Sequence, residues 1–250
     1  MKSSVNRSIS NEVKGIIKSV IQALPIAVTR NQKYDYQTVQ VMKRFLKADS
    51  NCIDIGCHKG DVLKSILDYS PKGTHYAFEP IPDLFNDLVD FFPSNCKFHQ
   101  IGLSDSKEEA SFNHVISNPA YSGFKKRRYD NSDEKVTKIT VNTDLLDNII
   151  PKDHKIDFIK IDVEGAELNV LKGGIATIKR NKPLIVFEHG LGAADYYKTG
   201  PDDIYNLLYE ECGLHVSLME NWLKNKKPLN KQEFQEQFYK GLNYYFIAYY

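Results

Sequence analysis

Between residues 50 and 190 the chain alternates short apolar runs with amphipathic stretches, and this alternation constrains the fold more than any other feature. Runs that are apolar on both faces are typical of strands buried in a parallel sheet. The predicted strands are residues 51–55, 74–78, 97–103, 157–161 and 184–187. Because amphipathic segments separate them, the sequence predicts an α/β fold with a mostly parallel sheet sandwiched by helices.

Local signals place the other elements. Helices are predicted at 61–69, 82–91 and 165–173, the first two ending just before a proline. Residues 104–142 interrupt the alternation of strands and helices. Two runs of alternating apolar and polar residues flank a polar segment there, which predicts a strand pair with an inserted, mobile loop. Apolar spacing predicts N-terminal helices at 11–24 and 36–46, and further strands at 214–219 and 241–250. We therefore expect a helical extension (1–48) packed on one domain (49–250) that carries an insertion at about 104–142.

The charge balance limits the classes of partner. Thirty-three Lys and Arg face 32 Asp and Glu, so the net charge of +1 creates no global field for nucleic acid or an anionic membrane. Four cysteines without a CxxC pair, and no secretory signal, predict a reduced cytoplasmic protein. The apolar stretch 16–28 is too short to span a bilayer. The amphipathic helix at 11–24 is expected to pack on the domain or a partner, with peripheral membrane contact as the alternative.

The first candidate site is the turn that follows the strand at 51–55. Its glycines fall only at 56 and 60, and His58 replaces the middle glycine that a dinucleotide requires. The turn also lacks the Gly-Lys-Ser/Thr ending of a triphosphate-binding loop. An adenosine-type ligand without phosphates fits such a turn, and S-adenosylmethionine is that ligand. The alternative is a tight strand-to-helix connection that binds nothing.

Acidic and small residues after the next strands extend this cofactor site. Glu79 lies 25 residues after Asp54, near the spacing at which an acid accepts ribose hydroxyls. Asp54 is expected near the cationic methionine end, and Ser104 or Asp105 near the adenine. The predicted cofactor-binding residues are Asp54, Gly56, Cys57, His58, Gly60, Glu79, Pro80, Gly102, Leu103, Ser104 and Asp162.

A second group of ionisable residues follows the strands at 157–161 and 184–187. Asp162, Glu164 and His189 are the catalytic candidates, and either Asp162 or His189 is expected to act as the general base. No metal is predicted outright, but Asp162, Glu164 and Glu188 are the candidate ligands for a divalent cation. Glu167 is equally well explained as a residue that favours the start of a helix.

Three segments together resemble the FkbM family of S-adenosylmethionine-dependent methyltransferases. They are Asp54-Ile55-Gly56-Cys57-His58-Lys59-Gly60, Phe78-Glu79-Pro80 and, most specifically, the run from Asp157 to Leu168 with Lys-Ile-Asp-Val-Glu-Gly at its centre, followed by Leu171-Lys172-Gly173 and Glu188-His189. The resemblance covers about residues 50 to 190. It implies a class I (Rossmann-like) methyltransferase fold and O-methylation, often of sugar hydroxyls in glycans, polysaccharides or natural products. Cys57-His58 departs from the Ala-Asn usual in the family.

This resemblance implies in-line methyl transfer with base assistance to a hydroxyl of a carbohydrate or small molecule. The basic run at 125–128, with Tyr121, Phe124 and Tyr129 around it, is a candidate acceptor surface or, equally, a solvated loop. Nucleic acid is not expected as a partner, because one short basic run gives a small electrostatic footprint. Two alternatives remain open: an NAD-dependent Rossmann enzyme and a non-catalytic cofactor-binding module of the same fold.

Overall fold

The structure is a computed structural model that describes residues 29–129 and 133–250. The chain divides after residue 40 into two units, and helix α2 (Arg30–Phe45) includes residues of both. Helix α2 begins earlier than the predicted helix at 36–46. The predicted helix at 11–24 lies outside the described residues, so the packing of an N-terminal extension stays a prediction.

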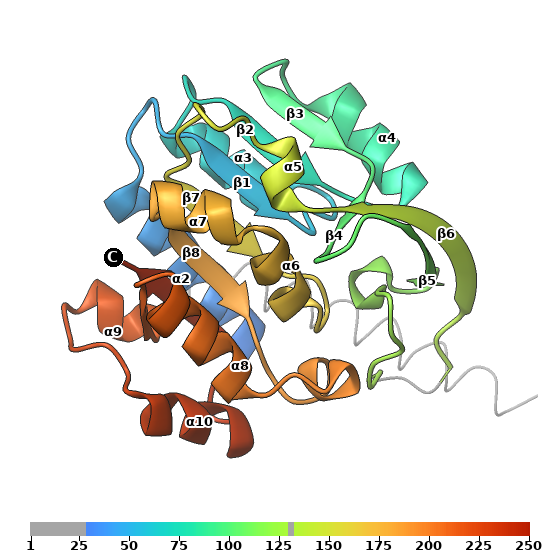
Figure 1. Cartoon of the computed structure of the whole chain (residues 1–250). Coiled ribbons are helices and arrows are strands. Elements are labelled where there is room, and N and C mark those ends of the chain that lie inside the picture. The colour runs from blue at the N-terminus through green and yellow to red at the C-terminus, as the bar shows by residue number, and fades with distance from the viewer. Residues whose placement is uncertain (1–28, 130–132) are drawn as a thin grey trace, which may run out of the picture. The chain divides into compact units, whose positions relative to one another are not determined.

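A seven-stranded sheet forms the centre of the second unit (Figure 1). Five strands pair in parallel, while β10 runs antiparallel to both of its neighbours. In spatial order the strands are β3 (Cys96–His99), β2 (His75–Phe78), β1 (Cys52–Ile55), β7 (Phe158–Ile161), β8 (Leu184–Glu188), β10 (Tyr245–Tyr249) and β9 (His215–Ser217). All four residues of β1, of β2 and of β7 are buried, as expected for strands covered on both faces.

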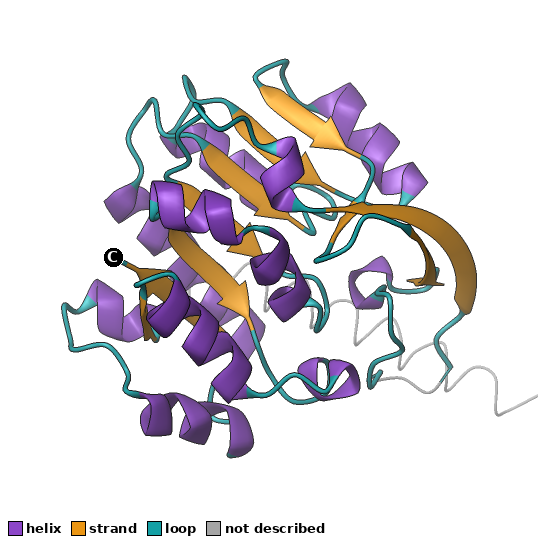
Figure 2. Ribbon diagram, in the orientation of Figure 1, coloured by secondary structure: helices purple, strands orange, loops and turns teal. Residues whose placement is uncertain are grey.

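Helices cover both faces of this sheet (Figure 2). From β1 through β2 to β3 the chain moves toward one edge of the sheet, and from β7 to β8 it moves toward the other edge. Because both kinds of connection are right-handed crossovers, α3 and α6 lie on opposite faces of the sheet. Figure 1 accordingly shows α6 and α7 in front of the sheet and α3 behind it. The helices are α3 (Asp61–Tyr69), α4 (Pro82–Phe91), α5 (Leu146–Ile149), α6 (Glu167–Gly173), α7 (Ile175–Asn181), α8 (Pro201–Tyr205), α9 (Met219–Leu223) and α10 (Lys231–Tyr239), with η1 (Pro119–Tyr121), η2 (Ala194–Tyr197) and the π-helical η3 (Asn206–Glu211).

The predicted insertion forms a second, three-stranded sheet. Strands β5 (Glu109–Val115) and β6 (Val136–Asp144) make the expected antiparallel pair, and β4 (Gly102–Leu103) joins β6 in parallel. The predicted single strand at 97–103 is therefore wrong. The chain leaves the main sheet after His99, and Gly102 pairs with Thr143 of the second sheet instead. This departure carries the chain from the central sheet to the insertion.

Other predicted boundaries shift for local reasons. Helices α3 and α4 occupy the predicted ranges, but α6 begins at Glu167 because Gly165 has a φ of +105°, which no helical residue adopts. The last strand begins at Tyr245, since Gly241, with a φ of +58°, first ends the turn after α10. Both differences reflect positive-φ glycines.

Buried apolar side chains from the sheet and its helices make one core, which includes Ile53, Phe187 and Phe246. Burying each such side chain contributes about 1.5–3 kcal/mol. All four cysteines lie in the described part of the chain, are buried and form no disulfide, as predicted. Among the described residues, no helix has the length and apolar character needed to cross a membrane.

Candidate functional site

The turn after β1 brings the chain close to the tip of β7. Gly56 has a φ of +74°, and a Cβ placed on it would lie 2.0 Å from the carbonyl oxygen of Asp162, so the position requires glycine. The amides of Gly56 and Cys57 both donate to the carbonyl of Phe78. His58 occupies the position of the middle glycine in a dinucleotide-binding turn. Its φ of +49° is a backbone conformation that is usual for glycine. The backbone shape of a ligand-binding turn is therefore kept.

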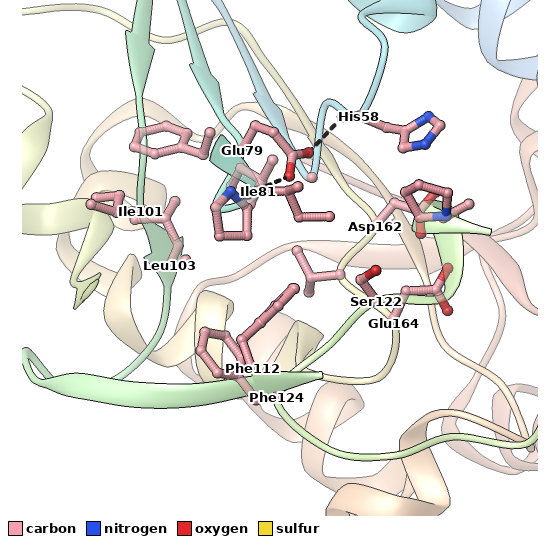
Figure 3. A pocket seen from close by; sticks show the side chains of 18 residues that line it. His58, Glu79, Ile81, Ile101, Leu103, Phe112, Ser122, Phe124, Asp162 and Glu164 are labelled. Carbon is pink, nitrogen blue, oxygen red and sulfur yellow. Dashed lines mark hydrogen bonds between the residues drawn. The ribbon is translucent and has the colours of Figure 1, made fainter. Parts of the chain in front are cut away.

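Glu79, at the end of β2, holds this turn (Figure 3). One carboxylate oxygen accepts from the amide of His58 and the other from the amide of Ile81, both at 2.9 Å. A carboxylate has about four lone-pair sites, so each oxygen keeps one acceptor site for another donor. Burial raises the pKa of Glu79 to about 7, although the two amides act in the opposite direction.

Asp54 lies beneath the turn, at the centre of the sheet. Its side chain is fully buried, and neither carboxylate oxygen has a hydrogen-bond partner among the described residues. Lys160, its neighbour across the β1–β7 ladder, places Nζ 3.9 Å from Asp54 Oδ1. Burial raises the pKa of Asp54 to about 6, and Lys160 only partly offsets it.

Asp162 follows β7 and receives several donors. Its Oδ2 lies 3.2 Å from Lys160 Nζ and accepts a hydrogen bond of 2.5 Å from the hydroxyl of Tyr245. Although burial acts to raise its pKa, the charge of Lys160 and hydrogen bonds from Glu188, Tyr245 and Lys160 lower it. Burial raises the pKa of Glu188 well above its usual range, and the neighbouring charge of Asp162 adds to this. The pKa values of the two neighbouring carboxyls are thus shifted in opposite directions.

A cavity opens above these strand tips. Glu79, Asp162 and Glu164 lie on its polar side, and Ile81, Ile101, Leu103, Phe112 and Phe124 form an apolar wall (Figure 3). A flat adenine ring suits the apolar wall and a cationic sulfonium suits the carboxylates, so the lining fits S-adenosylmethionine.

The structure brings most of the predicted site residues to this cavity. Its lining includes Gly56, His58, Glu79, Pro80, Gly102, Leu103, Asp162 and Glu164. Five of the others lie outside the lining: Asp54, Cys57, Gly60, Ser104 and Glu188. Cys57 is buried, a Cβ on Gly60 would meet the ring of Phe92, and Ser104 lines a separate pocket behind Phe124. These residues shape the site or lie beside it without lining the cavity.

His189 is also absent from the cavity lining. Its ring is fully buried and stacks on Phe238, with ring centroids 4.6 Å apart, and on Phe234 at 6.2 Å. Burial lowers its pKa to about 4. The geometry therefore favours Asp162 over His189 for any contact with a substrate proton.

The insertion covers the cavity from the other side. Pro119, Ala120 and Ser122 complete its lining, and Arg127 forms an ion pair with Glu164. The amide of Lys125 donates to the hydroxyl of Tyr197 at 3.0 Å, and the amide of Arg128 donates to the carbonyl of Gly192 at 3.1 Å. The basic run is thus attached to the rim of the site, and the segment is not a freely solvated loop.

Glu167 holds the turn after β7 as Glu79 holds the turn after β1. Its Oε1 accepts from the amides of Val163, at 3.2 Å, and Gly165, at 3.1 Å. Glu164 between them has a φ of +58°, a conformation that costs about 1–3 kcal/mol for a residue with a side chain. Glu167 therefore stabilises the strained turn that presents Glu164 to the cavity.

Asp162, Glu164 and Glu188 meet one geometric requirement of a metal site, because one oxygen from each lies within 4.8 Å of the others. However, Lys160 already pairs with Asp162, and Arg127 already pairs with Glu164. A divalent cation would have to lie beside these two side-chain cations, which repel it. The cluster as it is formed does not fit a metal.

Sequence reasoning missed several residues of the site. Lys160 was noted only as part of a motif and given no role, and Tyr245 is separated from Asp162 by 83 positions. Phe112 reaches the cavity only because the insertion folds over it, and Phe124, which was expected beside an acceptor surface, lines the cavity for the same reason. The one available signal was for Lys160, since a lysine inside an apolar strand requires an acidic partner.

Comparisons with known proteins identify the family of this chain. The sequence model of the Methyltransferase FkbM domain matches residues 54–216, which include both turns. The chain is 29% identical over 170 residues to a protein named 2-O-methyltransferase NoeI from Sinorhizobium fredii (strain NBRC 101917 / NGR234). That alignment covers 57% of this chain and 65% of the relative, so the chain spans slightly less than two thirds of the relative's length.

A solved structure described as methyltransferase FkbM from Methylobacillus flagellatus KT has a similar fold. It superposes with a TM-score of 0.50 at 16% identity, covering 82% of this chain and 44% of that one. At this identity the likeness concerns the fold alone. It confirms the predicted class I methyltransferase architecture.

Proposed function

Since the chain belongs to the FkbM methyltransferase family, we propose that it transfers a methyl group from S-adenosylmethionine to a hydroxyl oxygen of a sugar, glycan or related small molecule. The family uses S-adenosylmethionine. One observation carries the proposal: carboxylates from the ends of three adjacent strands, Asp54, Glu79 and Asp162, surround or underlie a single cavity. The name of the 2-O-methyltransferase relative supports oxygen as the acceptor atom.

Three parts of the cavity hold the donor. The free acceptor sites of Glu79 bind the two ribose hydroxyls, and the apolar wall that includes Leu103 and Phe124 packs on the adenine. Asp162 and the buried charge of Asp54 favour the cationic methionine end beside Gly56. When bound, S-adenosylmethionine supplies an electrophilic methyl group.

Asp162 orients the acceptor. Its ionised carboxylate accepts a hydrogen bond from the acceptor hydroxyl, which places the oxygen in line with the methyl carbon and sulfur. Such alignment contributes up to roughly 7–11 kcal/mol. As the new C–O bond forms and the C–S bond breaks, the hydroxyl proton becomes strongly acidic and passes to Asp162. A carboxylate with a lowered pKa is basic enough for this late proton transfer.

We propose that this reaction needs no divalent metal, because Lys160 and Arg127 supply the positive charge near the carboxylates. Transfer that continues after exhaustive chelation with EDTA supports this. Activity that is lost with EDTA and restored by Mg²⁺ contradicts it.

The insertion is proposed to bind the acceptor. Lys125 Nζ lies 5.0 Å from the centre of the Tyr197 ring, and Arg127 lies 4.9 Å from that of Tyr121, so cations and aromatic faces alternate along the rim. Aromatic faces pack on the apolar faces of sugar rings, and cations bind acidic groups. The net charge of +1 argues against nucleic acid as the acceptor.

The test is methyl transfer itself. The protein is incubated with S-adenosylmethionine carrying a deuterated methyl group and a panel of neutral, amino-sugar and uronic-acid oligosaccharides, and products are analysed by mass spectrometry. We expect one deuterated methyl group on a hydroxyl oxygen, and loss of the product with Asp162→Asn. Transfer only to nitrogen or carbon acceptors would contradict the proposal.

A further inference from the structure

Tyr245 lies on β10, outside the range 54–216 matched by the family model. It is directly opposite Glu188 in the antiparallel β8–β10 register. Strand β8 separates β10 from β7, yet the Tyr245 hydroxyl reaches past the end of β8 and donates to Asp162 Oδ2 at 2.5 Å. The last strand of the chain therefore contributes a side chain that contacts a carboxylate of the cavity lining.

The backbone of Asp162 is fixed without help from Tyr245. Its amide donates to the carbonyl of Ile55 at 3.1 Å, and its own carbonyl lies against Gly56. The carboxylate still has to be oriented by side chains. Lys160 Nζ lies 3.2 Å from Oδ2, but Lys160 also lies 3.9 Å from the buried Asp54, so its ammonium is shared between two acids. Tyr245, on β10, donates to the same oxygen.

We propose that Tyr245 is a positioning residue for methyl transfer, which acts by holding the Asp162 carboxylate in the orientation that receives the acceptor hydroxyl. This inference rests on the proposed function, because it assigns the role through Asp162. Tyr245 itself contacts neither donor nor acceptor. Without its hydroxyl, the carboxylate keeps only Lys160 and Glu188 as partners, and the acceptor oxygen loses its alignment.

The test compares two Tyr→Phe substitutions on one strand. Tyr249, four positions further along β10, packs near His215 and Trp222 and does not line the cavity. Tyr245→Phe is expected to lower kcat by about 10- to 100-fold, because small misplacements of reacting groups cost rates of this order. The affinity for S-adenosylhomocysteine and the thermal midpoint are expected to stay within error of the wild type. Tyr249→Phe is expected to leave kcat unchanged.

A double-mutant cycle separates positioning from a general structural effect. In the Asp162→Asn background, Tyr245→Phe is expected to lower the remaining rate by less than about twofold, because the interaction is already lost. A full additional loss in that background would overturn the proposal, as would a Tyr245→Phe enzyme with wild-type kcat. A wild-type protein that methylates no hydroxyl in the oligosaccharide panel would overturn the proposed function, and this inference with it.

Discussion

Lys160 lies directly opposite Asp54 in the parallel register of β7 and β1, with its Nζ 3.9 Å from Asp54 Oδ1 and both side chains buried. The same ammonium lies 3.2 Å from Asp162. One buried cation thus joins the acid beneath the first turn to the acid that faces the cavity. Because isolated buried charges are costly, this arrangement links the stability of the fold to the geometry of the site.

Replacing this lysine is expected to destabilise the protein strongly. Lys160→Met leaves Asp54 buried without a counter-charge, which costs about 3–5 kcal/mol and lowers the Tm by roughly 10 °C. Asp54→Asn in the same chain should recover much of the loss. The control is Lys155→Met, which removes an ion pair between an exposed lysine and Asp157, worth about 1 kcal/mol or less. Equal effects of the two single substitutions, measured by thermal unfolding, would contradict this account.

The ion pair between Arg127 and Glu164 is expected to keep the insertion closed over the cavity. Arg127→Met should weaken binding of S-adenosylhomocysteine by about tenfold. Removing one partner of a partly buried ion pair costs more free energy than removing one partner of an exposed pair. Glu164→Gln should have a similar effect, and the double variant should be no worse than either. Lys126→Met, which changes an exposed neighbour, is the control. If the affinity of Arg127→Met for S-adenosylhomocysteine, measured by calorimetry, is within twofold of the wild-type affinity, the ion pair does not keep the insertion closed.

Ligand affinity is expected to depend on pH through Glu79. Its pKa of about 7 in the free protein means that the acceptor sites for ribose are fully present only above neutrality. The bound ligand favours the ionised form, so affinity for S-adenosylhomocysteine should rise by up to about tenfold per pH unit below 7 and level off above it. Glu79→Gln should bind weakly and lack this inflection. A flat calorimetric profile for the wild type between pH 6 and 8 would argue against Glu79 as the ribose acceptor.

The two predicted bases are expected to behave differently. Asp162→Asn should lower kcat by about 10²–10⁴-fold, because a placed carboxylate contributes on this scale. His189→Phe keeps an aromatic ring against Phe238 and should retain most of the activity, with a thermal midpoint showing an intact fold. Steady-state rates for the two variants decide between them. A large loss with His189→Phe in a folded protein would restore His189 as a catalytic candidate.

The sequence predicted the central fold well because local signals there agree with the tertiary structure. Helices α3 and α4 match their predicted ranges, since a proline follows each and the apolar faces are unambiguous. The strand at 97–103 could not be divided correctly. Its break depends on Gly102 pairing with Thr143, 41 positions away, and no local pattern reports such a pairing.

For the candidate site too, local sequence signals predicted some residues, and residues that depend on long-range packing were not predicted correctly. Glu79 and Asp162 were predicted because carboxyl ends of parallel strands meet at one edge of a sheet. His189 satisfies the same rule, but its ring lies against Phe234 and Phe238 from α10, which spacing alone does not reveal. Tyr245 and Arg127 reach the site from a distant strand and from the insertion. Side-chain direction and long-range docking therefore set the limit of prediction from sequence.

A crystal structure of the protein with S-adenosylhomocysteine would locate the donor site. We expect ribose hydroxyls within hydrogen-bonding distance of both Glu79 oxygens, adenine against Leu103 and Phe124, and the sulfur on the side of Asp162. Electron density for the ligand elsewhere, such as in the groove lined by Lys64, Leu88 and Phe91, would contradict this expectation.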